Sequence, residues 1–421
     1  MTTLQKTLHS YLTAELDYWD FSGVIRIIQN DTTLYEVCRG YSSIEFQIKN
    51  TMDTRFVAAS ISKQFTAFAI MILYDKGLLQ LHEKANQYLP ATMQLPTEIT
   101  VHQLLCHTSG LHNNYSFEDD FYVGADRLPY DKEQYFRDWI IKKPIKNPGR
   151  TFDYNNSNYN VLAWIIESVS GQTYHEFLKE HIFSKLGMNH TAFDNGQDIL
   201  INTANNYIRD YGALVRVPYT NSLYAIGAGS LVTNCDDLQK WYKCLKTKDI
   251  LSEHSYEIFL SEHQEHYCYG LELYGKDKYV HGGDFLGITA YTMYFFDEDL
   301  CILLLSNTGS LNQYRLGNAI TEILHNRQAP LSHQPEEILC SPEELAKYTG
   351  TYLPGKIQII QKDGKLYLVR VNENIHIELY CVGKHCFKKR YEEDQIVHNL
   401  IPDGSKTPSI WGFKRVSTQL F

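Results

Sequence analysis

The sequence predicts an α+β protein: an antiparallel sheet flanked by helices, with an all-helical subdomain and a small C-terminal β domain. Strand-like segments occur near both ends of residues 1–328, and a long helical stretch separates them. The late strands follow one another through short turns, which favours antiparallel pairing over crossover connections. Residues 343–421 alternate between apolar and polar side chains, as half-buried strands do.

The first half of the chain begins with a helix and a hairpin. Apolar residues recur at helical spacing at Leu4, Leu8, Tyr11, Leu12 and Leu16. Two strands, Gly23–Gln29 and Thr33–Arg39, flank the turn residues Asn30-Asp31. An apolar helix follows Ser60 and ends near Gly77, and a helical subdomain is expected over about residues 80–215. Its clearest helix runs from Asn156 to Val169 and stops at Gly171.

The second half returns to strands, expected at Gly229–Thr233, Tyr279–His281, Thr289–Phe296 and Cys301–Ser306. A last helix of the main domain follows, with apolar positions at Leu316, Ala319, Ile320, Ile323 and Leu324. The domain is therefore predicted to span residues 1–328, with a linker over 329–342. A separate β-barrel domain is expected over 343–421, with a first hairpin at Asp363-Gly364.

Composition describes an ordinary globular protein and excludes some classes of partner. Lys and Arg number 39 against 49 Asp and Glu, a formal charge of −10, which disfavours nucleic acid or an anionic membrane as the main partner. No apolar run reaches the length of a membrane span, and the N-terminus has no signal-peptide core. We therefore expect a cytoplasmic protein acting on a small molecule or peptide. Its oligomeric state is not indicated.

The nine cysteines do not predict a metal site. Their count is odd and most lie in apolar runs, which favours buried free thiols in a reducing compartment. Cys381, His385 and Cys386 are conceivable zinc ligands, but no second Cys/His pair has zinc spacing. We expect neither a metal nor another cofactor.

Ser60 and Lys63 form the most informative pair. Residues three apart share one helix face, so the Lys63 amine can reach the Ser60 hydroxyl. A serine needs a base to act as a nucleophile, and a lysine can serve only if burial or neighbouring positive charge holds it neutral. The helix start also directs backbone N–H groups toward a developing anion. The motif alone also fits a solvated helix face, but the apolar helix behind Lys63 favours its desolvation.

Two further motifs carry polar groups at element ends. Tyr154 and Asn156 precede a helix; Asn156 is either its cap or an amide that holds substrate or Lys63. His281-Gly282-Gly283 ends a strand before Asp284, either as a tight turn or as a place where a ligand approaches the backbone closely.

Taken as an ordered set, Ser60-x-x-Lys63, Tyr154-x-Asn156 and His281-Gly282-Gly283 resemble the serine hydrolases of the class C β-lactamase and penicillin-binding-protein group. Supporting phrases are Leu104–Leu111, Asn147–Gly149, Leu186–Met188 and the glycine stretch Gly227–Asp237. The resemblance covers about residues 10–325 and implies a β-lactamase/transpeptidase-like fold. The Tyr348–Tyr352 opening of the tail looks like the small β-barrel of many relatives.

The resemblance implies the role of each residue. Ser60 would be the nucleophile, Lys63 its partner and Tyr154 the general base or a co-base. Asn156, His281, Gly283 and Asp284 would contact substrate, the last through its backbone N–H in an oxyanion hole shared with Ser60. The cycle would pass through an acyl-enzyme that water hydrolyses.

One departure bears on the substrate. Family β-lactamases and carboxypeptidases usually carry lysine and threonine where this chain has His281 and Gly282, so recognition of a free carboxylate should be weaker. We therefore expect an esterase, amidase or D-amino-acid peptidase rather than an efficient β-lactamase. A catalytically idle, ligand-binding family member is the alternative. The tail could serve stability or shape access to the site, and the sequence leaves both open.

Overall fold

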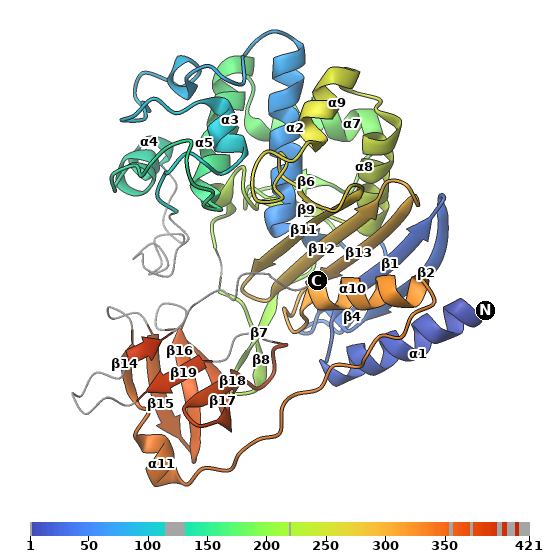
Figure 1. Ribbon diagram of the computed structural model, residues 1–421, viewed down its shortest axis with the longest axis vertical. Helices are drawn as coiled ribbons and strands as arrows, with labels where there is room; N and C mark the ends of the chain where they lie inside the picture. The colour runs from blue at the N-terminus through green and yellow to red at the C-terminus, as the bar shows by residue number, and fades with distance from the viewer. Residues whose placement is uncertain are drawn as a thin grey trace.

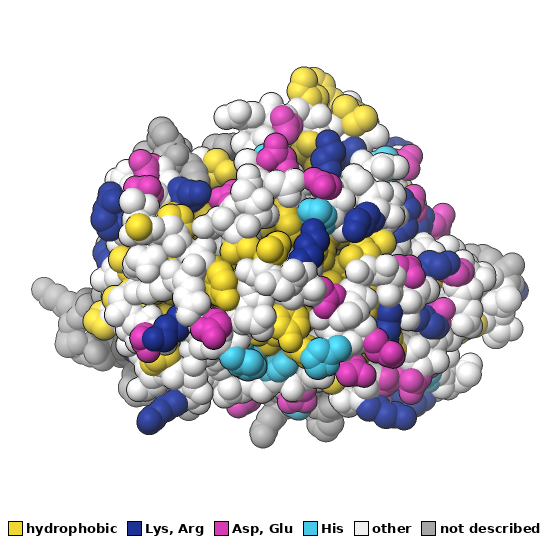
Figure 2. Space-filling model, turned by 90° about the horizontal axis from the view of Figure 1, so that it is seen from above, with side chains coloured by type: hydrophobic (Ala, Val, Ile, Leu, Met, Phe, Trp, Pro, Cys, Tyr) yellow, Lys and Arg dark blue, Asp and Glu magenta, His cyan; other side chains and the backbone are white. Residues whose placement is uncertain are grey.

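The computed structural model describes residues 2–113, 131–218, 220–352, 357–370, 374–393, 398–401 and 409–411 (Figure 1). Residues 114–130 of the predicted helical subdomain and parts of the predicted barrel lie outside the described residues. In the described part of the chain, no helix combines the length and apolarity needed to cross a bilayer. Figure 2 shows basic and acidic side chains interspersed over one face, without a broad patch of a single sign among its described residues.

The main sheet is antiparallel throughout, which confirms the predicted fold class. Its strand order is β10-β11-β12-β13-β1-β2, so the N-terminal hairpin joins the late strands. Gly23 pairs with Ser306, so the N-terminal hairpin is joined to a strand that follows the large insertion. The strands are β1 (Gly23–Gln29), β2 (Thr32–Arg39), β10 (Glu272–Tyr274), β11 (Lys278–Phe285), β12 (Ile288–Phe295) and β13 (Leu300–Ser306).

Helices cover both faces of this sheet (Figure 1). On one face, α1 (Thr3–Tyr18) and α10 (Gln313–Leu324) bury a cluster that includes Leu12 and Leu316. On the other face lie α2 (Ser62–Asp75), α8 (Cys235–Thr247) and α9 (Glu253–Leu260). The long helix α2 is buried on all sides from Ser62 to Leu73, as expected of a helix that runs through a core.

The insertion between β2 and β10 combines helices with several short strands. Its helix α5 (Asn156–Ser170) packs on α2 and ends at Gly171, whose φ of 71° suits only glycine without strain. The other helical pieces are α3 (Val101–Leu105), α4 (Lys132–Tyr135), the π-helical turns Phe136–Ile140 and Lys179–Phe183, α6 (Tyr174–Leu178) and α7 (Ser184–Leu186). Short strands also occur: β3 (Tyr41–Ser43), β4 (Ile48–Lys49), β5 (Phe56–Val57), β6 (Ala192–Phe193), β7 (Tyr207–Asp210), β8 (Ala213–Arg216) and β9 (Leu231–Thr233).

The C-terminal part forms a second antiparallel sheet in sequence order. It follows the helix α11 (Pro342–Ala346), which Ser341 caps. The strands are β14 (Gly350–Tyr352), β15 (Ile357–Lys362), β16 (Lys365–Arg370), β17 (Ile375–Gly383), β18 (Cys386–Lys389), β19 (His398–Ile401) and β20 (Ser409–Trp411). The predicted hairpin at Asp363-Gly364 is present. Among the described strands, no pairing joins β14 to β20, so the sheet is not closed into the expected barrel there.

The β7–β8 hairpin connects this sheet to the main domain. At its tip, Asp210 Oδ1 accepts a hydrogen bond from the His376 backbone N–H at 2.8 Å and lies 3.0 Å from the His376 Nδ1. The Tyr211 ring stacks on the same histidine, with 4.1 Å between ring centroids. The C-terminal sheet thus holds the end of a hairpin whose other end reaches the cleft described next.

Candidate active site

Ser60 lies in a tight turn at the entrance to α2. A 3₁₀ turn over Ala59–Ile61 joins β5 to the helix, and Ala59 has a φ of 44°. A non-glycine residue in this left-handed region costs about 1 kcal/mol or more, and such strain is concentrated at functional sites. The buried helix behind the turn fixes the serine in place.

Lys63 is completely buried and points back at this turn. Its Nζ lies 2.9 Å from Ser60 Oγ, 2.7 Å from Asn156 Oδ1 and 3.0 Å from the Ala228 carbonyl oxygen. Desolvation lowers the pKa of this lysine well below its usual range. Among the described residues, no acidic side chain forms an ion pair with it. The sequence-based expectation of a desolvated lysine is therefore met in the structure.

Tyr154 and Asn156 lie beside the pair. The face of the Tyr154 ring is 4.8 Å from Lys63 Nζ. Asn155, and not Asn156, caps α5, because its side chain accepts the Ser157 backbone N–H. This leaves the Asn156 amide to bond Lys63, which corrects the reading of Asn156 as the helix cap.

The strand β11 lies against the Ser60 turn because Gly283 has no side chain. A Cβ at Gly283 would stand 2.6 Å from the Ala58 carbonyl oxygen and 3.0 Å from the Ser60 nitrogen. The next residue, Asp284, is fixed through its carboxylate by Gln313 and Thr289. The sequence suggested that Gly283 lets a ligand approach the backbone. In the structure, it lets the turn that carries Ser60 pack closely against β11.

His281 is buried behind the cleft. Its Nδ1 is 2.7 Å from the Gly282 carbonyl oxygen and its Nε2 is 3.3 Å from the Tyr267 hydroxyl. A carbonyl oxygen only accepts, so the proton lies on Nδ1. Burial lowers the pKa of His281 to about 3, so the ring is neutral at neutral pH.

A cleft of about 480 Å³ opens above these groups. Ser60, Tyr154, Asn156 and Asp284 line it, whereas Lys63, His281 and Gly283 do not. Its wall also includes Arg216, at the end of β8. Of the sequence-predicted residues, four thus face the cleft and three support it from behind.

Two contributors escaped the sequence reasoning. The Ala228 carbonyl is a main-chain group within the noted glycine stretch, and no side-chain pattern marks it. His107 lies in a phrase noted only for its resemblance, yet its ring is 4.5 Å from that of Tyr154. Both contacts join segments far apart in the chain, so spacing could not reveal them.

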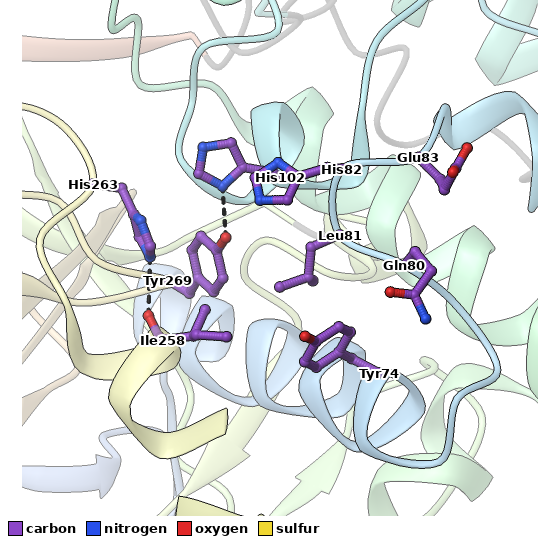
Figure 3. A pocket seen from close by; sticks show the side chains of 9 residues that line it. All are labelled: Tyr74, Gln80, Leu81, His82, Glu83, His102, Ile258, His263 and Tyr269. Atoms are coloured by element: carbon purple, nitrogen blue, oxygen red, sulfur yellow. Dashed lines mark hydrogen bonds between the residues drawn. The ribbon is translucent and has the colours of Figure 1, made fainter. Parts of the chain in front are cut away.

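A second hollow of about 390 Å³ lies beside α3 (Figure 3). Figure 3 shows the His102 ring facing Tyr269, whose hydroxyl is 2.6 Å from Nδ1, with His263 and His82 nearby. Burial and the neighbouring histidines lower the pKa of His102 to about 4. Among the described residues, no group of His, Cys, Asp and Glu side chains is arranged to hold a metal ion.

The fold and the site define a class: an antiparallel sheet flanked by helices, with a serine and a lysine paired at the start of a buried helix, is the architecture of the β-lactamase-type serine hydrolases. The family model for beta-lactamase matches residues 14–327, and the chain belongs to this family.

Individual relatives agree with this assignment. The chain is 30% identical over 305 residues to PbpX of Bacillus subtilis (strain 168), covering 72% of this chain and 74% of that protein. The structure of an octameric penicillin-binding protein homologue from Pyrococcus abyssi matches with a TM-score of 0.67 and 25% identity, over 93% of this chain and 94% of that one. A D-stereospecific amidohydrolase from Streptomyces sp. shares the fold, with a TM-score of 0.60 and 20% identity over 72% of this chain and 93% of that one. The amidohydrolase likeness shows the fold alone, whereas the family match supports serine hydrolase activity in general.

Proposed function

We propose that the protein hydrolyses a small ester, an amide or a D-aminoacyl peptide through an acyl-enzyme on Ser60. The observation that carries the proposal is the buried Lys63 amine, which contacts the serine hydroxyl and has no acidic partner among the described residues. A charge in that position would be unpaired, and an unpaired buried charge is costly enough that the group loses its proton instead.

The neighbours of Lys63 support proton transfer from Ser60 to its amine. A neutral amine has two N–H donors and one lone pair. Asn156 Oδ1 and the Ala228 carbonyl oxygen can only accept, so they take the two N–H groups. The lone pair is then left for the hydroxyl of Ser60. Lys63 is in this way poised as the base, and the Tyr154 ring face stabilises the ammonium that forms.

In the first half-reaction, Ser60 Oγ bonds the substrate carbonyl carbon while its proton passes to Lys63. The backbone N–H groups of Ser60 and Asp284 hold the oxyanion. The bond to the leaving alcohol or amine then breaks, and Lys63 returns the proton to it, through the Tyr154 hydroxyl where the geometry requires. In the second half-reaction, water adds to the acyl carbon, its proton passes to the same base, and the acid and Ser60 are released.

The cleft favours neutral acyl substrates over penicillins. His281 is neutral and faces away from the cleft, and Gly282 offers no hydroxyl, so this strand presents no charged contact for a carboxylate. Arg216 is the one Lys or Arg residue among the described residues that line the cleft, and its Nη2 already donates a hydrogen bond to Asn205 Oδ1 at 2.9 Å. Esters and D-aminoacyl amides are therefore the preferred substrates.

Intact-protein mass spectrometry tests the proposal. Wild type, Ser60→Ala and a control, Ser62→Ala, are each mixed with p-nitrophenyl acetate and with a penicillin. Ser62 is buried two residues away and its hydroxyl accepts the Leu231 backbone N–H, so it matches Ser60 in location but not in chemistry. We expect an acetyl adduct, or release of p-nitrophenol, with wild type and Ser62→Ala, and neither with Ser60→Ala.

The reagents also divide the substrate classes. Faster reaction with the ester supports the esterase or amidase assignment, and faster reaction with the penicillin would reverse that order. If neither reagent acylates Ser60 or turns over, the catalytic proposal fails, and the chain is better described as a binding member of the family.

A further inference from the structure

His107 holds the cleft's Tyr154 segment from behind. It follows α3, is completely buried, and has a φ of 58°, a left-handed conformation that few non-glycine residues adopt. Its carbonyl oxygen accepts the Asp153 backbone N–H at 2.9 Å. The main chain at His107 is thereby hydrogen-bonded to Asp153, the residue that precedes Tyr154.

The imidazole bonds the residue on the other side of Tyr154. His107 Nδ1 accepts the Asn155 backbone N–H at 3.1 Å and lies 3.2 Å from Asn158 Nδ2. Because a backbone N–H can only donate, Nδ1 carries the lone pair and the proton lies on Nε2. Burial lowers the pKa of His107 well below its usual range, so the ring stays neutral.

The faces of the imidazole pack on the aromatic rings of the site. The ring centroid of His107 is 4.5 Å from that of Tyr154 and 4.7 Å from that of Tyr267. Within the described residues, Nε2 has no hydrogen-bond partner. A buried N–H without a hydrogen-bond partner lowers the stability of the fold. Because the protein keeps this imidazole at that cost, its Nδ1 and its ring faces must contribute something that an apolar ring would not.

We propose that His107 is a positioning residue that fixes the Tyr154 ring and the Asn156 amide over Lys63 Nζ, through the acceptor Nδ1 and the ring face. This inference rests on the proposed function, because its effect on turnover requires acyl transfer at Ser60. His107 touches neither Ser60 nor the cleft, so its influence passes through the segment that it holds.

Two substitutions separate the acceptor from the ring. His107→Phe keeps an aromatic face and removes the acceptor, so that the Asn155 N–H and Asn158 Nδ2 lose this partner. His107→Asn removes the ring but places Oδ1 near the position of Nδ1, and asparagine tolerates the left-handed backbone. Steady-state hydrolysis of p-nitrophenyl acetate is measured for both, with His102→Phe as the control in the second hollow.

We expect His107→Phe to lower kcat by roughly 10- to 100-fold with KM changed by less than about threefold, because a displaced catalytic group costs on this scale. His107→Asn should recover most of this loss, and His102→Phe should keep kcat. A purely structural role would lower the amount of folded enzyme without changing kcat per active site, which titration of acylated Ser60 measures. Unchanged kcat in His107→Phe would overturn the proposal.

A second measurement needs neither turnover nor a stable variant. In ¹⁵N NMR of the wild type, the imidazole assigned to His107 should remain neutral in the Nε2–H tautomer from about pH 5 to 9, outside the ordinary titration of histidine. A ring that titrates in this range, or that carries its proton on Nδ1, cannot accept the Asn155 N–H and would refute the positioning role. Failure of Ser60→Ala to abolish hydrolysis would instead refute the proposed function and leave this result intact.

Discussion

The cleft at Ser60 and the histidine-lined hollow beside α3 are close in volume, at about 480 Å³ and 390 Å³. They differ in what they bring together. The cleft joins a strained turn, a helix start and a desolvated amine at one serine oxygen. The hollow gathers imidazoles that bond tyrosine and main-chain groups, and none of the described residues that line it is a serine.

These two regions show that a shifted pKa alone does not mark an active site. Burial lowers the pKa of both Lys63 and His102. In the cleft, the lowered value leaves a lone pair facing a hydroxyl that can become a nucleophile. In the hollow, the neutral His102 ring bonds the Tyr269 hydroxyl, so its lowered pKa is a consequence of packing.

The largest effect is expected from Lys63→Met, which keeps an unbranched side chain of similar length and removes the base. Loss of a positioned general base costs about 10²- to 10⁴-fold, so we expect kcat/KM for p-nitrophenyl acetate to fall by about 10³. Lys243→Met, on the exposed face of α8, is the matched control. A loss below about tenfold in Lys63→Met would mean that another group takes the Ser60 proton.

Gly283→Ala tests whether catalysis needs the close contact between β11 and the turn that carries Ser60. The added methyl group would collide with the Ala58 carbonyl oxygen and approach the Ser60 nitrogen, so the nucleophile turn must shift. A misplacement of this kind costs on the order of 100-fold in kcat. Gly383→Ala, where the new carbon would meet Cys386 at an ordinary 3.4 Å, should leave kcat unchanged. Equal kcat values in the two variants would show that the position of β11 does not influence the catalytic geometry.

The parts of the fold that could be predicted from the sequence are those marked by residues close together in the chain. The hairpin at Asn30-Asp31 was placed within one residue because its turn residues and alternating strands are local features. The helix from Asn156 was placed equally well, because a capping residue and Gly171 bound it. The short strands β7 and β8 were not predicted individually, since strands of four residues carry almost no periodicity.

Within the site, the sequence indicated the side chains but not their mutual arrangement. Ser60 and Lys63 are neighbours on one helix, so their contact follows from spacing. The Ala228 carbonyl and the His107 ring reach the site only through tertiary packing. His281 was expected to face substrate, but its ring bonds the Tyr267 hydroxyl instead. The sequence of a buried strand does not indicate toward which face its last residues point.

Burial of Lys63 also predicts a pH dependence of stability. The folded state holds this amine neutral, whereas the unfolded chain protonates it below about pH 10.4. The unfolded state therefore binds more protons, and stability rises with pH from the lowered pKa up to about 10.4. Relative to Lys63→Met, the free energy of unfolding should rise by up to about 1.4 kcal/mol per pH unit. Urea unfolding at pH 7, 8 and 9 measures this slope, and parallel curves would show that Lys63 remains charged.

The C-terminal sheet is expected to influence the cleft by a smaller amount, through the β7–β8 hairpin. Asp210→Ala removes both hydrogen bonds to His376, and the other end of the hairpin carries Arg216 into the cleft wall. We expect KM to rise about two- to fivefold with kcat unchanged, as for a loss of uniform binding. Glu336→Ala, in the exposed linker, is the control. Unchanged KM together with a lower melting temperature would assign the C-terminal sheet to stability alone.

The smallest effect is expected in the histidine-lined hollow. His102→Phe fills the same space and removes the hydrogen bond to Tyr269, which costs roughly 1 kcal/mol of folding free energy. Because the hydrogen-bond partners of Ser60 and Lys63 among the described residues do not line the hollow, kcat and KM should stay within about twofold of wild type. Thermal unfolding and esterase kinetics on one preparation check both values. A tenfold loss of kcat in a folded variant would show that α3 transmits the state of the hollow to the cleft, and the two regions would then have to be treated as one site.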